Sequence, residues 1–205
     1  MEISITGQAE TAVAPDEAVV TLVVEGSGRD AARVTADVHA RTNRLLEEID
    51  HLPDGTVTAV HTDGVRSWAD DHDRRTTHTA TGQVRVTFAD FTRMAECTGA
   101  WAAAGVEVRY TSWRLSDASR RDALAGLVGD ALDQARTKAE VIANHLGATG
   151  LEVVHVTDDA RSSAPAFAGT AMRFAGAAPV APDPVEARPE DIVVETALTV
   201  VFRAH

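Results

Sequence analysis

The amino-acid sequence lacks several features that would narrow its biology quickly. It contains one cysteine in 205 residues, which excludes an internal disulfide, and aromatic residues make up only 4%. No apolar run approaches the roughly 20 residues that a membrane-spanning helix needs. Basic residues are outnumbered, with 19 Lys and Arg against 31 Asp and Glu, and the formal net charge is −12. Because an acidic surface repels phosphate groups, nucleic acid and anionic membranes are disfavoured as partners.

The sequence opens Met-Glu-Ile-Ser-Ile-Thr, without the basic and apolar segments of a signal peptide. We therefore expect a soluble cytoplasmic protein. A chain of this length can bury a substantial core, as one large domain or as two small ones. We expect a single domain over residues 1–205, built from two intertwined halves at about 1–89 and 90–205.

The stretch from Ser116 to Gly147 predicts one long amphipathic helix. Ser116 suits the N-cap position, and Gly147 suits the position just after the helix. Apolar residues recur at spacings of three and four, which places them on one stripe. The residues of this expected stripe are Leu124, Leu127, Val128, Ala131, Ala135, Ala139, Ile142 and Leu146. Since the stripe is mostly alanine, the helix can lie close to a sheet.

The rest of the chain alternates between strand and helix patterns. The expected strands cover residues 2–9, 17–25, 56–68, 77–88, 106–115, 151–157 and 191–203. Two shorter helices are expected, one after Ser27 and Asp30 and one from Asp90 to Ala104. A polar loop is expected at residues 69–76. The pattern predicts an α+β fold in the order ββαββαβαββ, with a mixed, mostly antiparallel sheet packed by the long helix and the two shorter ones.

Residues 158–189 form a loose segment rich in Ala, Gly and Pro. A structureless stretch of this length is uncommon in a compact domain. It also carries three large apolar side chains, Phe167, Met172 and Phe174. Two interpretations stay open: a mobile surface loop, or an arm that packs on another subunit.

Gly26-Ser27-Gly28-Arg29-Asp30-Ala31 fits the pattern G-x-G-x-x-A, which binds dinucleotides when it joins a strand to a helix. The acidic residue that should end the next strand is missing, because Glu47 and Glu48 fall inside the expected helix. Ser27 and Asp30 also form a Ser-x-x-Asp capping box. We favour the cap over cofactor binding and expect no cofactor.

The region 61–78 concentrates histidines and aspartates that could ligate a divalent metal. These residues are His61, Asp63, Asp70, Asp71, His72, Asp73 and His78. Their spacing matches no metal template, and Arg74 and Arg75 would offset the acidic charge. A solvated charged loop is the plainer interpretation, and no metal ligand is assigned.

Other residues that carry chemistry have structural explanations. Cys97 lacks a sequence signature for a nucleophile, and the histidines are dispersed. It suits packing beside Met94 and Trp101. Trp68 and Trp113 could stack a ligand, but packing is the favoured explanation. The aspartates of the long helix, Asp117, Asp122, Asp130 and Asp133, suit its solvated face. We therefore assign no catalytic residue.

Four patches, together with the closing strand Val194–Phe202, resemble the SIMPL domain family, also called DUF541. The patches are Ile5-Thr6-Gly7 through Pro15-Asp16 to Val19; His61-Thr62-Asp63-Gly64-Val65; Gly105 through Leu115-Ser116-Asp117; and Ala135, Lys138, Ala139, Ala143 and Gly147. Their order and spacing span nearly the whole chain. The chain departs from the family pattern at Pro189-Glu190, where a Pro-Gly is usual, and at Gly82.

The resemblance implies association rather than chemistry. The family has no agreed catalytic motif, and its members are tied to signalling, stress defence or surface antigenicity, with some self-assembling. Many are bacterial envelope proteins with signal peptides. We expect a non-enzymatic protein that forms a homo-oligomer or binds another protein, in stress defence or signalling. The alternative is a metal- or small-ligand-binding protein or enzyme that uses the region 61–78.

Overall fold

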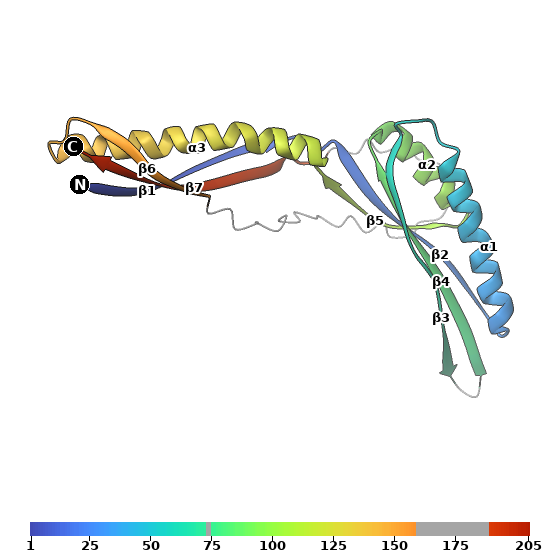
Figure 1. Ribbon diagram of the computed structural model, residues 1–205. Helices are drawn as coiled ribbons and strands as arrows, with labels where there is room; N and C mark the ends of the chain where they lie inside the picture. Colours follow the sequence, from blue (N-terminus) through green and yellow to red (C-terminus); the bar gives the residue numbers. More distant parts are fainter. Residues whose placement is uncertain (73–74, 159–188) are drawn as a thin grey trace. The chain divides into compact units, whose positions relative to one another are not determined.

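The computed structural model describes residues 1–72, 75–158 and 189–205 (Figure 1). Its elements follow the expected order ββαββαβαββ, and every strand pair is antiparallel, so the predicted α+β fold is confirmed. In chain order they are β1 (Glu2–Val13), β2 (Glu17–Gly28), α1 (Ala31–Asp50), β3 (Val57–His72), β4 (Arg75–Phe88), α2 (Phe91–Ala103), β5 (Glu107–Arg114), α3 (Asp117–His145), β6 (Leu151–Asp158) and β7 (Ile192–Ala204).

The described residues divide into two compact units, and each unit has its own sheet. Unit 1 contains Met1–Pro15, residues 115–158 and Glu190–His205, with a three-stranded sheet in the order β1-β7-β6. Unit 2 contains Asp16–Arg114, with a four-stranded sheet in the order β3-β4-β2-β5. The strands therefore form two sheets. The expected halves at about residues 1–89 and 90–205 stay a prediction.

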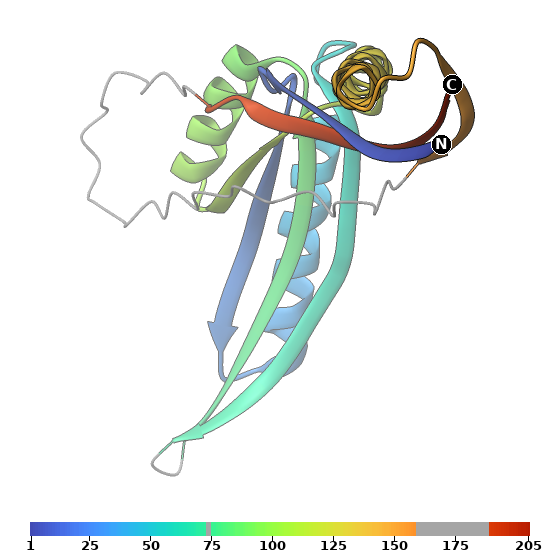
Figure 2. The same cartoon turned by 90° about the vertical axis from the view of Figure 1, so that its left-hand side faces the viewer.

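The core of unit 2 lies between its sheet and the helices α1 and α2. β2 is an interior strand, and its residues Val20, Leu22 and Val24 are fully buried. α1 faces them with Val38, Leu45 and Ile49, and α2 contributes Met94 and Trp101. The Trp101 ring lies 6.2 Å from that of Phe88 on β4. Figure 2 shows the strands of this sheet in front and α1 behind them.

The core of unit 1 lies between α3 and the three-stranded sheet. α3 packs on β1 and β7 and has few contacts with β6 (Figure 1). The buried side chains of the helix are Leu127, Ala131, Ala135, Ala139 and Ala143. Ala135 and Ala139 pack with Val200 and Phe202 of β7, and their small side chains let the two backbones lie close together.

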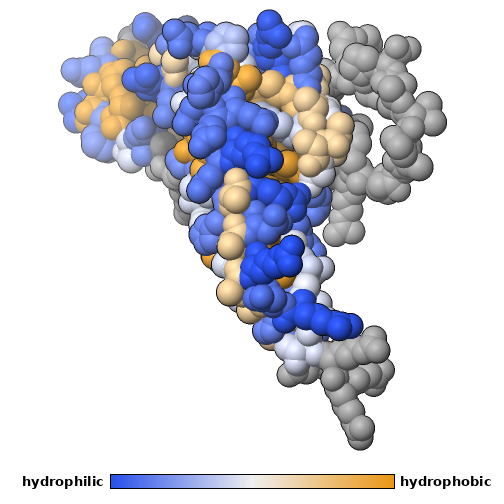
Figure 3. Space-filling view, turned by 90° about the vertical axis from the view of Figure 1, so that its right-hand side faces the viewer, coloured by the Kyte–Doolittle hydropathy of each residue, from blue (hydrophilic) through white to orange (hydrophobic). Residues whose placement is uncertain are grey.

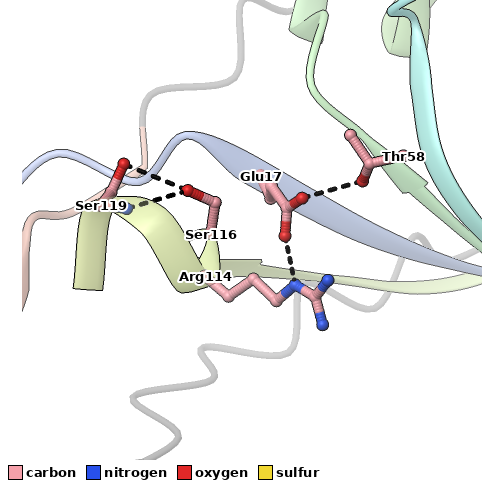
Figure 4. A network of polar contacts seen from close by, with 5 residues as sticks. All are labelled: Glu17, Thr58, Arg114, Ser116 and Ser119. Carbon is pink, nitrogen blue, oxygen red and sulfur yellow. Dashed lines mark hydrogen bonds and ion pairs between the residues drawn. The ribbon is translucent and has the colours of Figure 1, made fainter. Parts of the chain in front are cut away.

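Both ends of α3 follow the sequence signals. Ser116 is the N-cap, and its Oγ accepts a hydrogen bond of 3.2 Å from the backbone N of Ser119 (Figure 4). Gly147 has a φ of +79°, the left-handed conformation that ends many helices and that glycine adopts without strain. The prediction of one helix over this stretch is confirmed.

The prediction of which α3 residues are buried is partly wrong. Val128, Ile142 and Leu146 are exposed rather than buried, while Ala143, absent from the expected stripe, is buried. The buried residues are spaced strictly by four, which is more than the 3.6 residues of a helical turn. The face of α3 that contacts the sheet therefore rotates gradually along the helix, and the larger apolar side chains lie outside that face.

Two local expectations are also wrong. Ser27 does not cap α1, because β2 continues through Gly28 and pairs Ser27 with Thr79. The N-cap is Asp30 alone, whose Oδ1 accepts a bond of 3.1 Å from Arg33 N. The expected loop 69–76 is mostly strand, since β3 and β4 pair as far as His72 opposite Arg75.

Candidate functional site

The structure places the region 61–78 along a two-stranded ribbon rather than around a point. His61 pairs with Arg85 across the ladder, whereas His78 pairs with Ala69. Asp63 forms an ion pair of 3.4 Å with Arg85. At about 3.3 Å per residue, His61 and His78 are therefore separated by several rungs. Asp73 lies outside the described residues, as do Phe167, Met172 and Phe174 of the expected arm.

The described part of this ribbon therefore has no converging ligand set. Among residues 1–70, 76–158 and 189–205, whose side chains the structure describes, no three or more His, Cys, Asp or Glu side chains lie where they could hold a metal ion. Trp68, on the same ribbon, is 50% exposed. Ligand binding at residues 61–78 stays a prediction that no contact among the described residues favours.

The glycines of the G-x-G-x-x-A pattern serve helix packing. Gly26 and Gly28 lie in β2, where a Cβ on Gly26 would come within 2.9 Å of Val38 Cγ2 and one on Gly28 within 2.9 Å of Val34 Cγ2. Both valines belong to α1. Glycine at these positions therefore lets α1 lie against the end of β2, which explains the pattern without a cofactor.

Cys97 lies on α2, half-buried against the core of unit 2. Burial raises the pKa of its thiol, the neighbouring carboxylate of Glu96 raises it further, and the guanidinium of Arg93 lowers it. A catalytic thiol needs the opposite shift, since the thiolate is the nucleophile. Cys97 therefore behaves as a packing residue.

Trp113 is also a packing residue, because its ring lies 4.9 Å from that of Phe91 in an edge-on arrangement.

Glu17 is the one buried acid among the described residues, and sequence reasoning did not single it out. Thr58 Oγ1 donates to its Oε1 at 2.8 Å, and Arg114 Nε donates to its Oε2 at 2.7 Å (Figure 4). Both carboxylate oxygens are thus engaged, and the contacts tie the start of β2 to β3 and to the end of β5. The arrangement holds three strands together and leaves no free base.

An open depression of about 330 Å³ lies at the C-terminal end of α1 and the start of β3. Its lining is Ile49, Asp50, Leu52, Pro53, Asp54, Gly55, Val57, Thr58, Ala59 and Val60. The titratable residues that line it are Asp50 and Asp54, and both are exposed. The lining offers neither a nucleophile beside a base nor a positive charge to bind an anion.

The helix side of unit 2 is also unsuited to a large apolar contact. Figure 3 looks onto the α1 side, where hydrophilic surface predominates. The exposed apolar residues of α1 are small ones, such as Ala32, Ala36 and Ala40. Isolated alanines of this kind are common on protein surfaces.

The β6 surface, which we define as Val153, Val154 and Val156, is a group of exposed apolar residues in unit 1. These side chains are 55%, 44% and 45% exposed. They follow one another within a single strand, and α3 leaves that strand largely uncovered. The sequence run Val-Val-His-Val resembles a buried strand, so the pattern alone gave no sign of this exposure.

Two comparisons with known proteins complete the description. The model of a family described as SIMPL, protein of unknown function (DUF541), matches residues 3–202. No curated protein matches the chain. No helix among the described residues is both long and apolar enough to cross a bilayer.

Proposed function

The chain belongs to the SIMPL (DUF541) family, and on that premise we propose that it acts by associating with protein, its own copies first, rather than by catalysing a reaction. The observation that carries the proposal is the β6 surface. Its three valines are exposed by 44% or more, and burying apolar side chains of this kind against a partner is favourable.

The placement of the polar groups supports association. The buried carboxylate of Glu17 is occupied by Arg114 and Thr58. Burial of Cys97 disfavours its thiolate. The β6 surface is apolar, which suits binding to protein. Stress defence and signalling, which the family resemblance implies, are settings in which such association would act.

The proposal is tested by measuring the mass of the protein in solution. Sedimentation velocity and light scattering, from about 1 to about 100 µM, should show a reversible shift from one chain to a larger species. Higher salt should strengthen the association, because copies with a net charge of −12 repel one another less when screened. A single-chain mass throughout that range, at both low and high salt, would overturn self-association.

A further inference from the structure

β6 is an open edge of the three-stranded sheet. In the order β1-β7-β6 it pairs with β7 on one side and with no described strand on the other. Backbone N–H and C=O groups on such an edge are a template for another strand. The edge is eight residues long, from Leu151 to Asp158, which is enough for a strand pair.

Each of the other sheet edges carries a side-chain contact. On β1, the backbone N of Gln8 donates to Gln134 Oε1 of α3 at 2.9 Å, so a helix side chain occupies the edge. β3 has two register shifts and the Asp63–Arg85 ion pair. β5 has a register shift in its pairing with β2 and the ion pair between Glu107 and Arg109. Occupied backbone groups, charged side chains and register shifts hinder edge pairing, and β6 shares only the register shift among these named features, between Val153 and His155.

Two of the exposed valines of β6, Val153 and Val156, lie on the side of the sheet on which α3 packs. Val153 lies opposite Phe202 and Val156 lies opposite Val200, and both β7 residues are buried under the helix. The two valines share this side although they are three apart, because a bulge at Val154 shifts the register between Val153 and His155. Val153 and Val156 are therefore on the helix side of the sheet, next to the buried residues of β7, but remain exposed.

We propose that β6 of one copy pairs antiparallel with β6 of a second copy, about a two-fold axis that passes between Val154 and His155. This inference rests on the proposed function and specifies a second copy of the chain as the partner. The joined sheet would have the order β1-β7-β6-β6-β7-β1, with both copies of α3 on one side. Val153 would lie opposite Val156 of the partner subunit, and the symmetry repeats the contact.

The bulge makes this register self-consistent. Every pair that lies outside the bulge then joins residues on the same side of the sheet: Leu151 faces Asp158 of the partner subunit, and Glu152 faces Thr157 of the partner subunit. A shift by one residue in either direction would set residues from opposite sides of the sheet opposite each other, such as Val153 and Thr157 of the partner subunit. In one of the two directions it would also place Glu152 opposite Asp158 of the partner subunit, two like charges. The alternation of side chains therefore favours the register that pairs Val153 with Val156 of the partner subunit.

Disulfide trapping tests the register directly. In a Cys97→Ala background, Val153→Cys and Val156→Cys chains are mixed under mild oxidation and examined on non-reducing gels. Opposed residues in an antiparallel pair have Cα atoms about 4.5–5.5 Å apart, within the range of a disulfide. We expect a covalent dimer from the mixture. The matched control mixes Val153→Cys with Thr157→Cys, whose side chains lie on opposite sides of the sheet, and should give little.

A charge variant provides the second measurement. Val153→Lys combined with Val156→Lys sets lysines opposite each other and should raise the dimer dissociation constant by at least about tenfold. Val193→Lys, at an exposed valine of β7 away from the edge, should leave it unchanged. Circular dichroism confirms that each variant is folded.

The outcomes separate this inference from the proposed function. A dimer that forms without the 153–156 disulfide, or that persists in the lysine variant, overturns the β6 pairing and leaves association through another surface. A protein that stays a single chain at every concentration and salt overturns both.

Discussion

Gly7 determines how closely α3 approaches β1. It is buried in β1, opposite Leu198, and a Cβ there would collide with the backbone carbonyl of Ala131. Ala131 and Ala135 are themselves fully buried. The helix and the strand can therefore meet nearly backbone to backbone, which explains why the buried stripe of α3 is alanine rather than leucine.

Gly7→Ala should lower the free energy of unfolding by about 2–3 kcal/mol, because the added methyl forces α3 away from its sheet. Urea unfolding followed by circular dichroism measures the change. The matched control is Gly126→Ala, exposed in the interior of α3 with nothing near its Cβ position, which should stabilise by about 1 kcal/mol. Equal effects at the two positions would contradict the close approach.

Cys97 should react slowly with iodoacetamide at neutral pH. Since burial and then Glu96 raise the pKa of the thiol, the thiolate is populated at a higher pH than in a short peptide. The alkylation rate, followed by mass spectrometry, should therefore reach its midpoint at a pH above that of a peptide cysteine. Glu96→Gln should shift the midpoint down. A rate that is already at its plateau at pH 7 would contradict this account.

The same shift has a consequence for stability. Above the ordinary pKa of a thiol, the unfolded chain releases its proton before the folded chain does. Stability contributed by Cys97 is thus present at neutral pH and is lost as pH rises through that range.

At the scale of helices and strands, the N-caps depend on hydrogen bonds between residues close in sequence. Asp30 and Asp90 each accept a bond from the residue three positions on, at 3.1 and 3.0 Å. Ser116 was predicted as an N-cap, whereas Asp30 was taken as the acidic residue of a Ser-x-x-Asp capping box and Asp90 as the start of its helix. Ser27 was misread because the strand pattern of β2 seemed to end at residue 25, and only the pairing with β4 shows that it continues.

Asp30→Ala and Asp90→Ala should each lower the free energy of unfolding by about 1 kcal/mol, since each leaves a helix N–H without its acceptor. Ser27→Ala should change it by less than about 0.5 kcal/mol, because Ser27 is a strand residue away from any cap. Thermal and urea unfolding measure all three. If Ser27→Ala lowered the free energy of unfolding as much as Asp30→Ala, Ser27 would have to be part of a capping box after all.

The sequence predicted the order and type of the elements, because those depend on periodicity and on residues near each end. It did not predict that β7 lies between β1 and β6, since alternation does not identify a strand's partner. For the same reason the Glu17–Arg114 contact, between residues 97 positions apart, was missed. The exposure of the β6 valines depends on where α3 lies, which no local pattern records.

At the scale of the whole molecule, the two units differ in how the chain builds them. Apart from Pro189, the described residues of unit 2 form one continuous stretch, Asp16–Arg114. Unit 1 draws its sheet from both ends: Glu2 of β1 pairs with Arg203 of β7, and the amino group of Met1 donates to Ala204 O at 2.9 Å. Contacts between such distant residues require a large loop to close, which slows their formation.

We expect refolding to proceed unit by unit. In pulsed hydrogen exchange on the full chain, amides of β2 and β4 should gain protection before those of β1 and β7, because the pairing within unit 2 joins residues nearer in sequence. Mass spectrometry of peptides from each strand reads the order. Simultaneous protection of the two sheets would show a single cooperative step instead.

The central position of β7 also matters while the protein is being made. On the ribosome, residues 16–114 emerge complete and can collapse, while β1 waits with Ile3 and Ile5 uncovered until the codons for Ile192–Ala204 have been read. A nascent chain released before that point would carry two orphaned strands, β1 and β6, with nothing to join them. Such a product would be a natural client for chaperones and proteases.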